Sequence, residues 1–164
     1  MNGMKRVACL AGFALMAGTL SQAQLADKKA LTLQIARQVA AAAEQAAVAN
    51  HNHMFILIVD DGGNLMDMER MDEAQLGSFN VALAKARSAV FFKRPTKMFE
   101  DAVIKNGYTP ILKLPEAMPI EGGIPLLVDG HILGAIGVSG GTPQEDGKSA
   151  QAGADAFPGI VQGH

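Results

Sequence analysis

The sequence predicts an α+β domain in which helices pack on an antiparallel sheet of about five strands. Two turn clusters, Asp60–Asn64 and Asp129–Gly130, each lie between runs of β-forming residues, which is typical of hairpins. Apolar residues recur with helical spacing in two longer stretches, 27–49 and 72–92. Short connections favour hairpins over parallel crossovers, so we expect one sheet covered by helices.

The expected order of elements along the chain is α-β-β-α-α-β-β-β-α. Asp27 is the expected N-cap of the first helix, and Thr142 with Pro143 is the expected start of the last. Pro95 ends the second long helix, because proline disfavours the α conformation of the residue before it. Lys85 lies off the apolar stripe of that helix. The predicted boundaries are helices at 27–49, 72–92, 97–105 and 143–156, and four of the five strands at 54–59, 65–71, 124–128 and 132–138.

The glycine-rich segment 119–141 predicts a buried hairpin. Its two strands, 124–128 and 132–138, are apolar along nearly their whole length, so both are expected in the centre of the sheet. Gly134 and Gly137 have no side chain, so a helix backbone or a ligand is expected close to one of them.

Composition excludes several classes of function. A net charge of −2 argues against a nucleic-acid partner, because surfaces that bind phosphates carry a basic excess. The chain is 49% hydrophobic and 18% charged, which argues against a disordered protein. The single cysteine, Cys9, lies in a predicted targeting segment, so the mature chain is expected to have no disulfide, cysteine nucleophile or thiolate metal site.

Residues 1–23 predict a signal peptide. A positively charged start precedes an apolar run of 14 residues, Val7–Leu20. Ser21 and Ala23 then supply the small residues of a cleavage site. The alternative, a membrane anchor, is disfavoured because a span needs about 20 apolar residues. We therefore expect cleavage after Ala23, a secreted or periplasmic protein without a stable membrane span, and a single domain over 24–164.

Four segments occur in a characteristic order. They are VDDGGNLMDMERMD, the helix around Ala84-Lys85-Ala86, the Phe92 to Thr96 junction, and EGGIPLLVDGHILGAIGVSGG. In this order they resemble the GlcG/HbpS family, which includes the C-terminal domain of PduO-type proteins. The resemblance covers residues 31–153. It implies an α+β fold with an antiparallel sheet, frequent homo-oligomers, and haem binding in the members of known function, whereas other members have no settled activity.

Several residues are candidates to bind haem. Iron most often takes His as its axial ligand, with Met as an alternative. His51 and His53 have i, i+2 spacing, so in an extended segment their imidazoles point the same way; the alternative is a polar loop with two exposed histidines. His131 follows the Asp-Gly turn and is expected in solvent. Met66 and Met68 share one face of their strand and either contact a porphyrin or fill the core.

The resemblance implies one more candidate, between the second and third helices. Thr96 stands where a haem-binding member of the family has a threonine near the iron; a helix N-cap explains this residue equally well. Lys93, Arg94 and Lys97 surround it, and such a basic cluster either pairs with haem propionates or is simply solvated. The predicted cofactor-binding residues are therefore Thr96, His51, His53, Met68 and Arg94, with the two histidines as candidate ligands of the haem iron.

Two other functions remain open from the sequence. Gly122-Gly123 and Ser139-Gly140-Gly141 suit an anion-binding nest near the last helix, which would serve an enzyme or accessory protein acting on a small hydroxy or oxo acid. The second alternative is a ligand-free oligomeric scaffold that uses the alanine-rich helices as its interface. The interpretation that the residues and the resemblance favour together is a secreted or periplasmic homo-oligomer that binds haem for storage, sequestration or sensing.

Overall fold

The computed structural model describes residues 28–163, so the predicted signal peptide, Asp27 and His164 lie outside the described residues. Over this range the elements follow the predicted order, and the sheet has four strands rather than about five. The elements are α1 (Leu33–Ala49), β1 (Phe55–Asp60), β2 (Leu65–Arg70), α2 (Ser78–Phe91), α3 (Lys97–Ile104), the 3-10 helix η1 (Thr109–Lys113), β3 (Gly123–Val128), β4 (His131–Ser139) and α4 (Pro143–Gln162).

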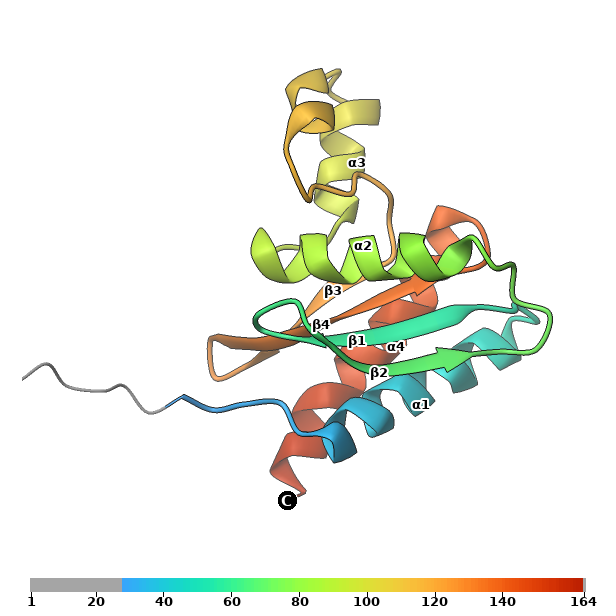
Figure 1. The fold of residues 1–164 in the computed structure, drawn as a ribbon, viewed down its shortest axis with the longest axis vertical. Coiled ribbons are helices and arrows are strands. Elements are labelled where there is room, and N and C mark those ends of the chain that lie inside the picture. Colours follow the sequence, from blue (N-terminus) through green and yellow to red (C-terminus); the bar gives the residue numbers. More distant parts are fainter. Residues whose placement is uncertain (1–27, 164) are drawn as a thin grey trace, which may run out of the picture.

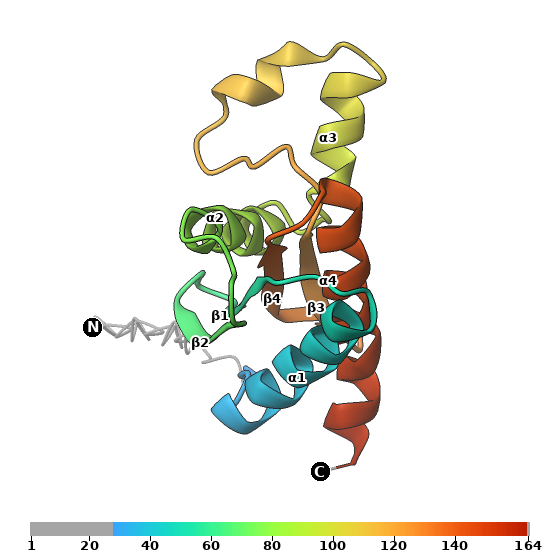
Figure 2. The same cartoon turned by 90° about the vertical axis from the view of Figure 1, so that its right-hand side faces the viewer.

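The sheet is antiparallel with strand order β2-β1-β4-β3, and helices cover both of its faces. Helix α2 crosses one face, whereas α1 and α4 pack side by side on the other (Figures 1 and 2). The larger core lies between the sheet and α1 and α4, and includes Val39, Ile56, Ile136 and Phe157. Within residues 28–163, none of the helices has both the length and the apolar character needed to cross a membrane.

The prediction that both strands of the glycine-rich hairpin are central is right for β4 and wrong for β3. Strand β4 pairs with β1 and β3, whereas β3 forms one edge of the sheet. Pro125 is tolerated in β3 because an edge strand leaves part of its N–H row without a ladder partner. Contacts with α2 and α4 explain why an edge strand is so apolar.

Two helices begin later than their periodicity predicts. Helix α1 begins at Leu33, and its N-cap is Thr32, whose Oγ1 accepts a hydrogen bond from the N–H of Ile35 at 3.3 Å. Helix α2 begins at Ser78 rather than at residue 72. Glu73 has a φ of 64°, a left-handed conformation that a continuous α-helix does not permit.

Two local predictions are confirmed. Asp129 and Gly130 have φ values of 49° and 76°, as a type I′ turn requires. Thr142 caps α4 through a capping box: its Oγ1 accepts from the N–H of Glu145 at 3.3 Å, and the Glu145 carboxylate accepts from the N–H of Thr142 at 2.8 Å. Helix α4 continues to Gln162, past the predicted end at residue 156.

Helix α2 lies unusually close to the sheet at Gly137. A Cβ placed on this glycine would lie 2.0 Å from the carbonyl oxygen of Ala82 and 2.7 Å from the backbone nitrogen of Ala86. Of the two expected neighbours of the glycines, a helix backbone or a ligand, the structure therefore has the helix at Gly137. The close approach brings Lys85 into the interior, although this residue lies off the apolar stripe of the helix.

Residues 97–117 form an arm that projects from the domain beyond α2 (Figures 1 and 2). The arm contains α3 and η1. Five of its large apolar side chains are 45–74% exposed: Met98, Ile104, Tyr108, Leu112 and Leu114. The arm therefore presents apolar surface that this chain does not bury.

Candidate functional site

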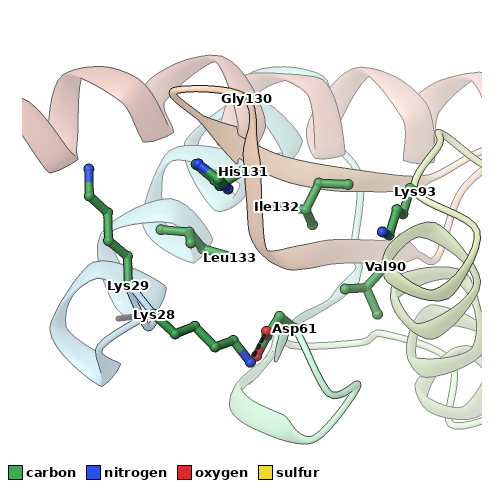
Figure 3. Close-up of a pocket in the computed structure, with 9 residues that line it drawn as sticks. All are labelled: Lys28, Lys29, Asp61, Val90, Lys93, Gly130, His131, Ile132 and Leu133. Carbon is green, nitrogen blue, oxygen red and sulfur yellow. Dashed lines mark ion pairs between the residues drawn. The ribbon is translucent and has the colours of Figure 1, made fainter. Parts of the chain in front are cut away.

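A cavity of about 460 Å³ opens beside the tip of the β3–β4 hairpin (Figure 3). This volume falls in the range of small-molecule sites, roughly 300–1,000 Å³. Four parts of the fold border the cavity: the residues before α1, the β1–β2 turn, the C-terminal end of α2, and the β3–β4 turn with the start of β4. The lining residues are Lys28, Lys29, Asp61, Val90, Lys93, Gly130, His131, Ile132 and Leu133.

Local structure explains the apolar part of this lining. The Asp129-Gly130 turn reverses the chain, so the first residues of β4 stand at the end of the sheet beside α2. Val90 and Leu133 are almost fully buried, at 5% and 7% exposure. Ile132 packs against the cluster that Val90 forms with Ala86 and Ala89 beneath α2. The cavity therefore has an apolar floor that is held firmly by the core.

The polar part of the lining is mainly basic. Lys28, Lys29 and Lys93 supply three ammonium groups, against one carboxylate from Asp61. Lys28 forms an ion pair with Asp61 (Figure 3). Positive charges at the rim favour anionic groups on a ligand, and an ammonium group can bind a carboxylate through a charge-assisted hydrogen bond. The rim therefore suits a ligand with carboxylates on an otherwise apolar body.

His131 adds a group that can bind iron. Its side chain is exposed at the mouth of the cavity and stands above Leu133 (Figure 3). An imidazole, an apolar floor and a basic rim are together the groups that a haem requires: an axial ligand, contact for the macrocycle and partners for the propionates.

His131 is exposed, as the sequence predicts, but the sequence did not predict the cavity that this residue lines. Its charged residues come from separate parts of the chain, near residues 28, 61, 93 and 131. The only local signals were the adjacent pair Lys28-Lys29 and a histidine directly after an Asp-Gly turn. Neither signal shows that these side chains share one cavity.

The predicted histidine pair does not have the expected geometry. His51 has a φ of 57° and lies in the turn after α1, so the segment is not extended, which was the condition for the two imidazoles to point the same way. His53 Nδ1 is 2.8 Å from the carbonyl oxygen of Asp72; because a carbonyl only accepts, Nδ1–H is the donor. Within residues 28–163, no group of three His, Cys, Asp or Glu side chains is placed to hold a metal ion.

Thr96 is fully buried, and its hydroxyl does not cap α3. Thr96 Oγ1 accepts a hydrogen bond from the N–H of Gly123 at 3.0 Å, and the N–H of Thr96 donates to the Gly123 carbonyl oxygen at 2.9 Å. The N-cap interpretation is therefore wrong for this side chain. Thr96 instead joins the α2–α3 junction to the start of β3.

The basic residues around Thr96 do not form one cluster. The Arg94 guanidinium lies 5.6 Å from the centre of the Phe99 ring. Lys97 Nζ lies within 3.3 Å of three carboxylates, those of Glu100, Asp101 and Glu121. The hydrogen bonds that Lys97 donates to Asp101 and Glu121 raise its pKa. Lys93 lines the cavity at the hairpin tip instead.

Met66 and Met68 do not share one face, because a β-bulge interrupts the β1–β2 register beside Ile58. Met66 packs against the larger core, whereas Met68 pairs with Leu57 and is 45% exposed. Among the described residues, no hydrogen bond, ion pair or ring contact joins any two of the predicted set Thr96, His51, His53, Met68 and Arg94.

The glycine-rich corner holds an anion that belongs to the chain itself. The Asp146 carboxylate accepts from the N–H of Gly141 at 2.9 Å and from Lys85 Nζ at 2.6 Å. Lys85 Nζ also donates to the carbonyl oxygen of Val138 at 3.0 Å. Burial lowers the pKa of Lys85 and raises the pKa of Asp146, while the attraction between the two opposes both shifts. The predicted anion nest is thus filled by Asp146.

Comparison with known proteins identifies similar chains of nearly the same extent. The family model described as haem-degrading protein HbpS-like matches residues 31–155. Protein GlcG of Escherichia coli K12 is 38% identical over 112 residues, which are 68% of this chain and 83% of GlcG. Protein ORFY of Klebsiella pneumoniae superposes with a TM-score of 0.74 and 34% identity, over 84% of this chain and 97% of ORFY.

Two further solved structures are similar to this chain. A double mutant of Streptomyces reticuli HbpS has a TM-score of 0.73 and 29% identity, and the match covers 95% of this chain and 99% of HbpS. A structure described as a PduOC:heme complex has a TM-score of 0.69 and 30% identity, over 78% of this chain and 95% of PduOC.

Proposed function

The chain belongs to the HbpS-like family, and we propose on that basis that it binds haem in the cavity at the tip of the β3–β4 hairpin. One observation supports this location for the haem: a single cavity combines an apolar floor, three lysines and His131. The haem complex of the similar protein PduOC supports the choice of ligand.

Each part of the cavity has a role in this proposal. His131 is the axial ligand of the iron. Lys28, Lys29 and Lys93 pair with the propionates, and the buried floor formed by Val90 and Leu133 contacts the macrocycle. Because His131 and the lysine rim are exposed, haem can leave as well as enter. Reversible binding suits storage, sequestration or sensing of haem.

Replacing His131 with alanine is expected to weaken haem binding by about tenfold or more, which corresponds to about 1.4 kcal/mol. The reason is the loss of the nitrogen that binds the iron. The measurement is a titration of residues 24–164 with haem, followed by the Soret absorbance. The wild-type protein should give a saturable shift, and His131→Ala a weaker and spectrally different one.

His51→Ala and His53→Ala are the matched comparisons, because the sequence predicted haem at these residues and both side chains are exposed. We expect the two histidine variants to bind as the wild type does. If either variant loses affinity for haem while His131→Ala binds as the wild type does, the haem site lies in the α1–β1 loop instead. A linear change in absorbance without saturation would contradict specific haem binding. Small hydroxy and oxo acids would then be the ligands to screen.

We further propose that the arm, residues 97–117, packs against a second copy of this chain. Its exposed apolar side chains support this, because monomeric proteins seldom leave large apolar patches in water. Substituting Ile104 and Leu112 together by lysine is expected to lower the molecular mass seen in sedimentation equilibrium to that of a monomer. Val48→Lys on α1, also an exposed apolar position, is the control and should keep the assembly. A monomeric wild type would contradict the proposal.

Export is also part of the proposed function, supported by the charged start, the apolar run Val7–Leu20 and the small residues Ser21 and Ala23. Expression of the full chain in a Gram-negative host should yield a periplasmic protein whose intact mass corresponds to a chain that begins at Gln24. Recovery of the uncleaved chain in the membrane fraction would instead support the anchor.

A further inference from the structure

Residues 28–31 form a strap that joins the tips of the two hairpins. Lys28 pairs with Asp61 in the β1–β2 turn, and Lys29 Nζ lies 3.1 Å from Asp129 Oδ2 in the β3–β4 turn. Leu31 is 6% exposed and belongs to the larger core, so it anchors the strap against the sheet. The strap therefore holds both lysines at the edge of the cavity (Figure 3).

Both ion pairs of the strap are open to solvent. The side chains of Lys28 and Lys29 are 67% and 65% exposed, and those of Asp61 and Asp129 are 31% and 70% exposed. Exposed ion pairs of this kind contribute little to stability. Their small contribution means that another carboxylate can replace either aspartate at little cost.

We propose that Asp61 and Asp129 compete with the carboxylates of the ligand for Lys28 and Lys29. The identity of the ligand as a porphyrin dicarboxylate rests on the proposed function. Binding exchanges two intrachain ion pairs for two pairs with the ligand, and release restores the original pairs. The aspartates thus lower the affinity for the bound dicarboxylate and keep the ligand exchangeable.

The two aspartates do not contribute equally. Asp61 lines the cavity itself and is the less exposed of the two, so its carboxylate also repels an incoming carboxylate once Lys28 has been drawn away. Asp129 lies in the turn and is 70% exposed, where water and salt screen its charge. Substitution of Asp61 should therefore change the affinity more than substitution of Asp129.

The test measures the affinity of residues 24–164 for iron-free protoporphyrin and for its dimethyl ester, by porphyrin fluorescence. Without iron, the result does not depend on His131. Asp61→Asn is expected to bind the free acid about two- to fivefold more tightly, which is the range that an exposed ion pair spans. Lys28→Gln is expected to weaken binding of the free acid by a similar factor. Neither substitution should change binding of the ester.

A double variant, Lys28→Gln with Asp61→Asn, completes a double-mutant cycle. Without Lys28, most of the gain in affinity for the free acid that Asp61→Asn gives should disappear. Equal binding of the free acid and the ester would overturn the proposed competition while leaving porphyrin binding intact. Weaker binding of the free acid by Asp61→Asn, at an unchanged melting temperature, would overturn it as well. If neither porphyrin binds, the competition fails, and the haem titration of the wild-type protein decides the proposed function separately.

Discussion

Lys85→Met is expected to lower the free energy of unfolding by about 3–5 kcal/mol, the range seen when one member of a buried ion pair is removed. The side chains of Lys85 and Asp146 are 1% and 3% exposed. Without the ammonium, the Asp146 carboxylate stays in the interior and, among the described residues, keeps only backbone N–H groups, those of Gly140 and Gly141, as hydrogen-bond donors. A buried charge with so little compensation is costly.

Urea denaturation of the single and double variants measures this effect. Asp146→Leu should be destabilised to a similar degree, because it leaves the Lys85 ammonium buried without its carboxylate. The double variant Lys85→Met with Asp146→Leu should recover much of the loss, since replacing a whole buried pair by apolar side chains is often nearly neutral.

Lys105→Met is the matched control for this pair. Lys105 Nζ lies 3.0 Å from Asp101 Oδ2, but its side chain is 64% exposed, so its removal should cost less than about 1 kcal/mol. If Lys85→Met costs no more than this control, the ion pair is not buried in solution as it is in the structure.

Gly137→Ala is expected to destabilise the fold by about 1–3 kcal/mol, the usual cost of inserting atoms into a packed interior. The added methyl group would meet the carbonyl oxygen of Ala82 at 2.0 Å, and a backbone atom cannot rotate away as a side chain can. Helix α2 must therefore move away from β4. Because Val90 and Lys93 at the end of this helix line the cavity, the affinity for haem should fall as well.

Gly159→Ala is the control for this prediction, because a Cβ at Gly159 in α4 meets no atom within 4 Å. Alanine at such a helical position restricts the unfolded chain and should raise the free energy of unfolding by about 0.4–1 kcal/mol. Thermal unfolding and the haem titration compare the two variants. An unchanged melting temperature for Gly137→Ala would show that α2 is less closely packed on the sheet than in the structure.

Local chemistry made much of the fold predictable. The Asp129-Gly130 turn needs two residues with positive φ, and the cap of α4 needs Thr142 with Glu145 three residues later, so both could be identified within a few residues of sequence. The order of the elements and the resemblance to the family were readable for the same reason: each depends on short segments that carry their own signal.

Predictions about which face or neighbour a residue meets were less successful, because those depend on distant segments. Lys85 is off the apolar stripe of α2, yet the carboxylate of Asp146, 61 residues later, draws it inside. Thr96 has the position of a helix cap, but its hydroxyl accepts a hydrogen bond from the N–H of Gly123 instead. Nothing in the residues around either position indicates these partners.

The sequence alone determined the α+β class, the order of the elements, the hairpin turn and the family, because these follow from periodicity, turn chemistry and motifs along the chain. Only the tertiary structure decided which strand is central, that Asp146 fills the glycine-rich corner, and that Lys28, Lys93 and His131 share one cavity. The physical reason is that a binding site is made by side chains that meet in space, and the packing of α2 and the strap on the sheet brings these three together.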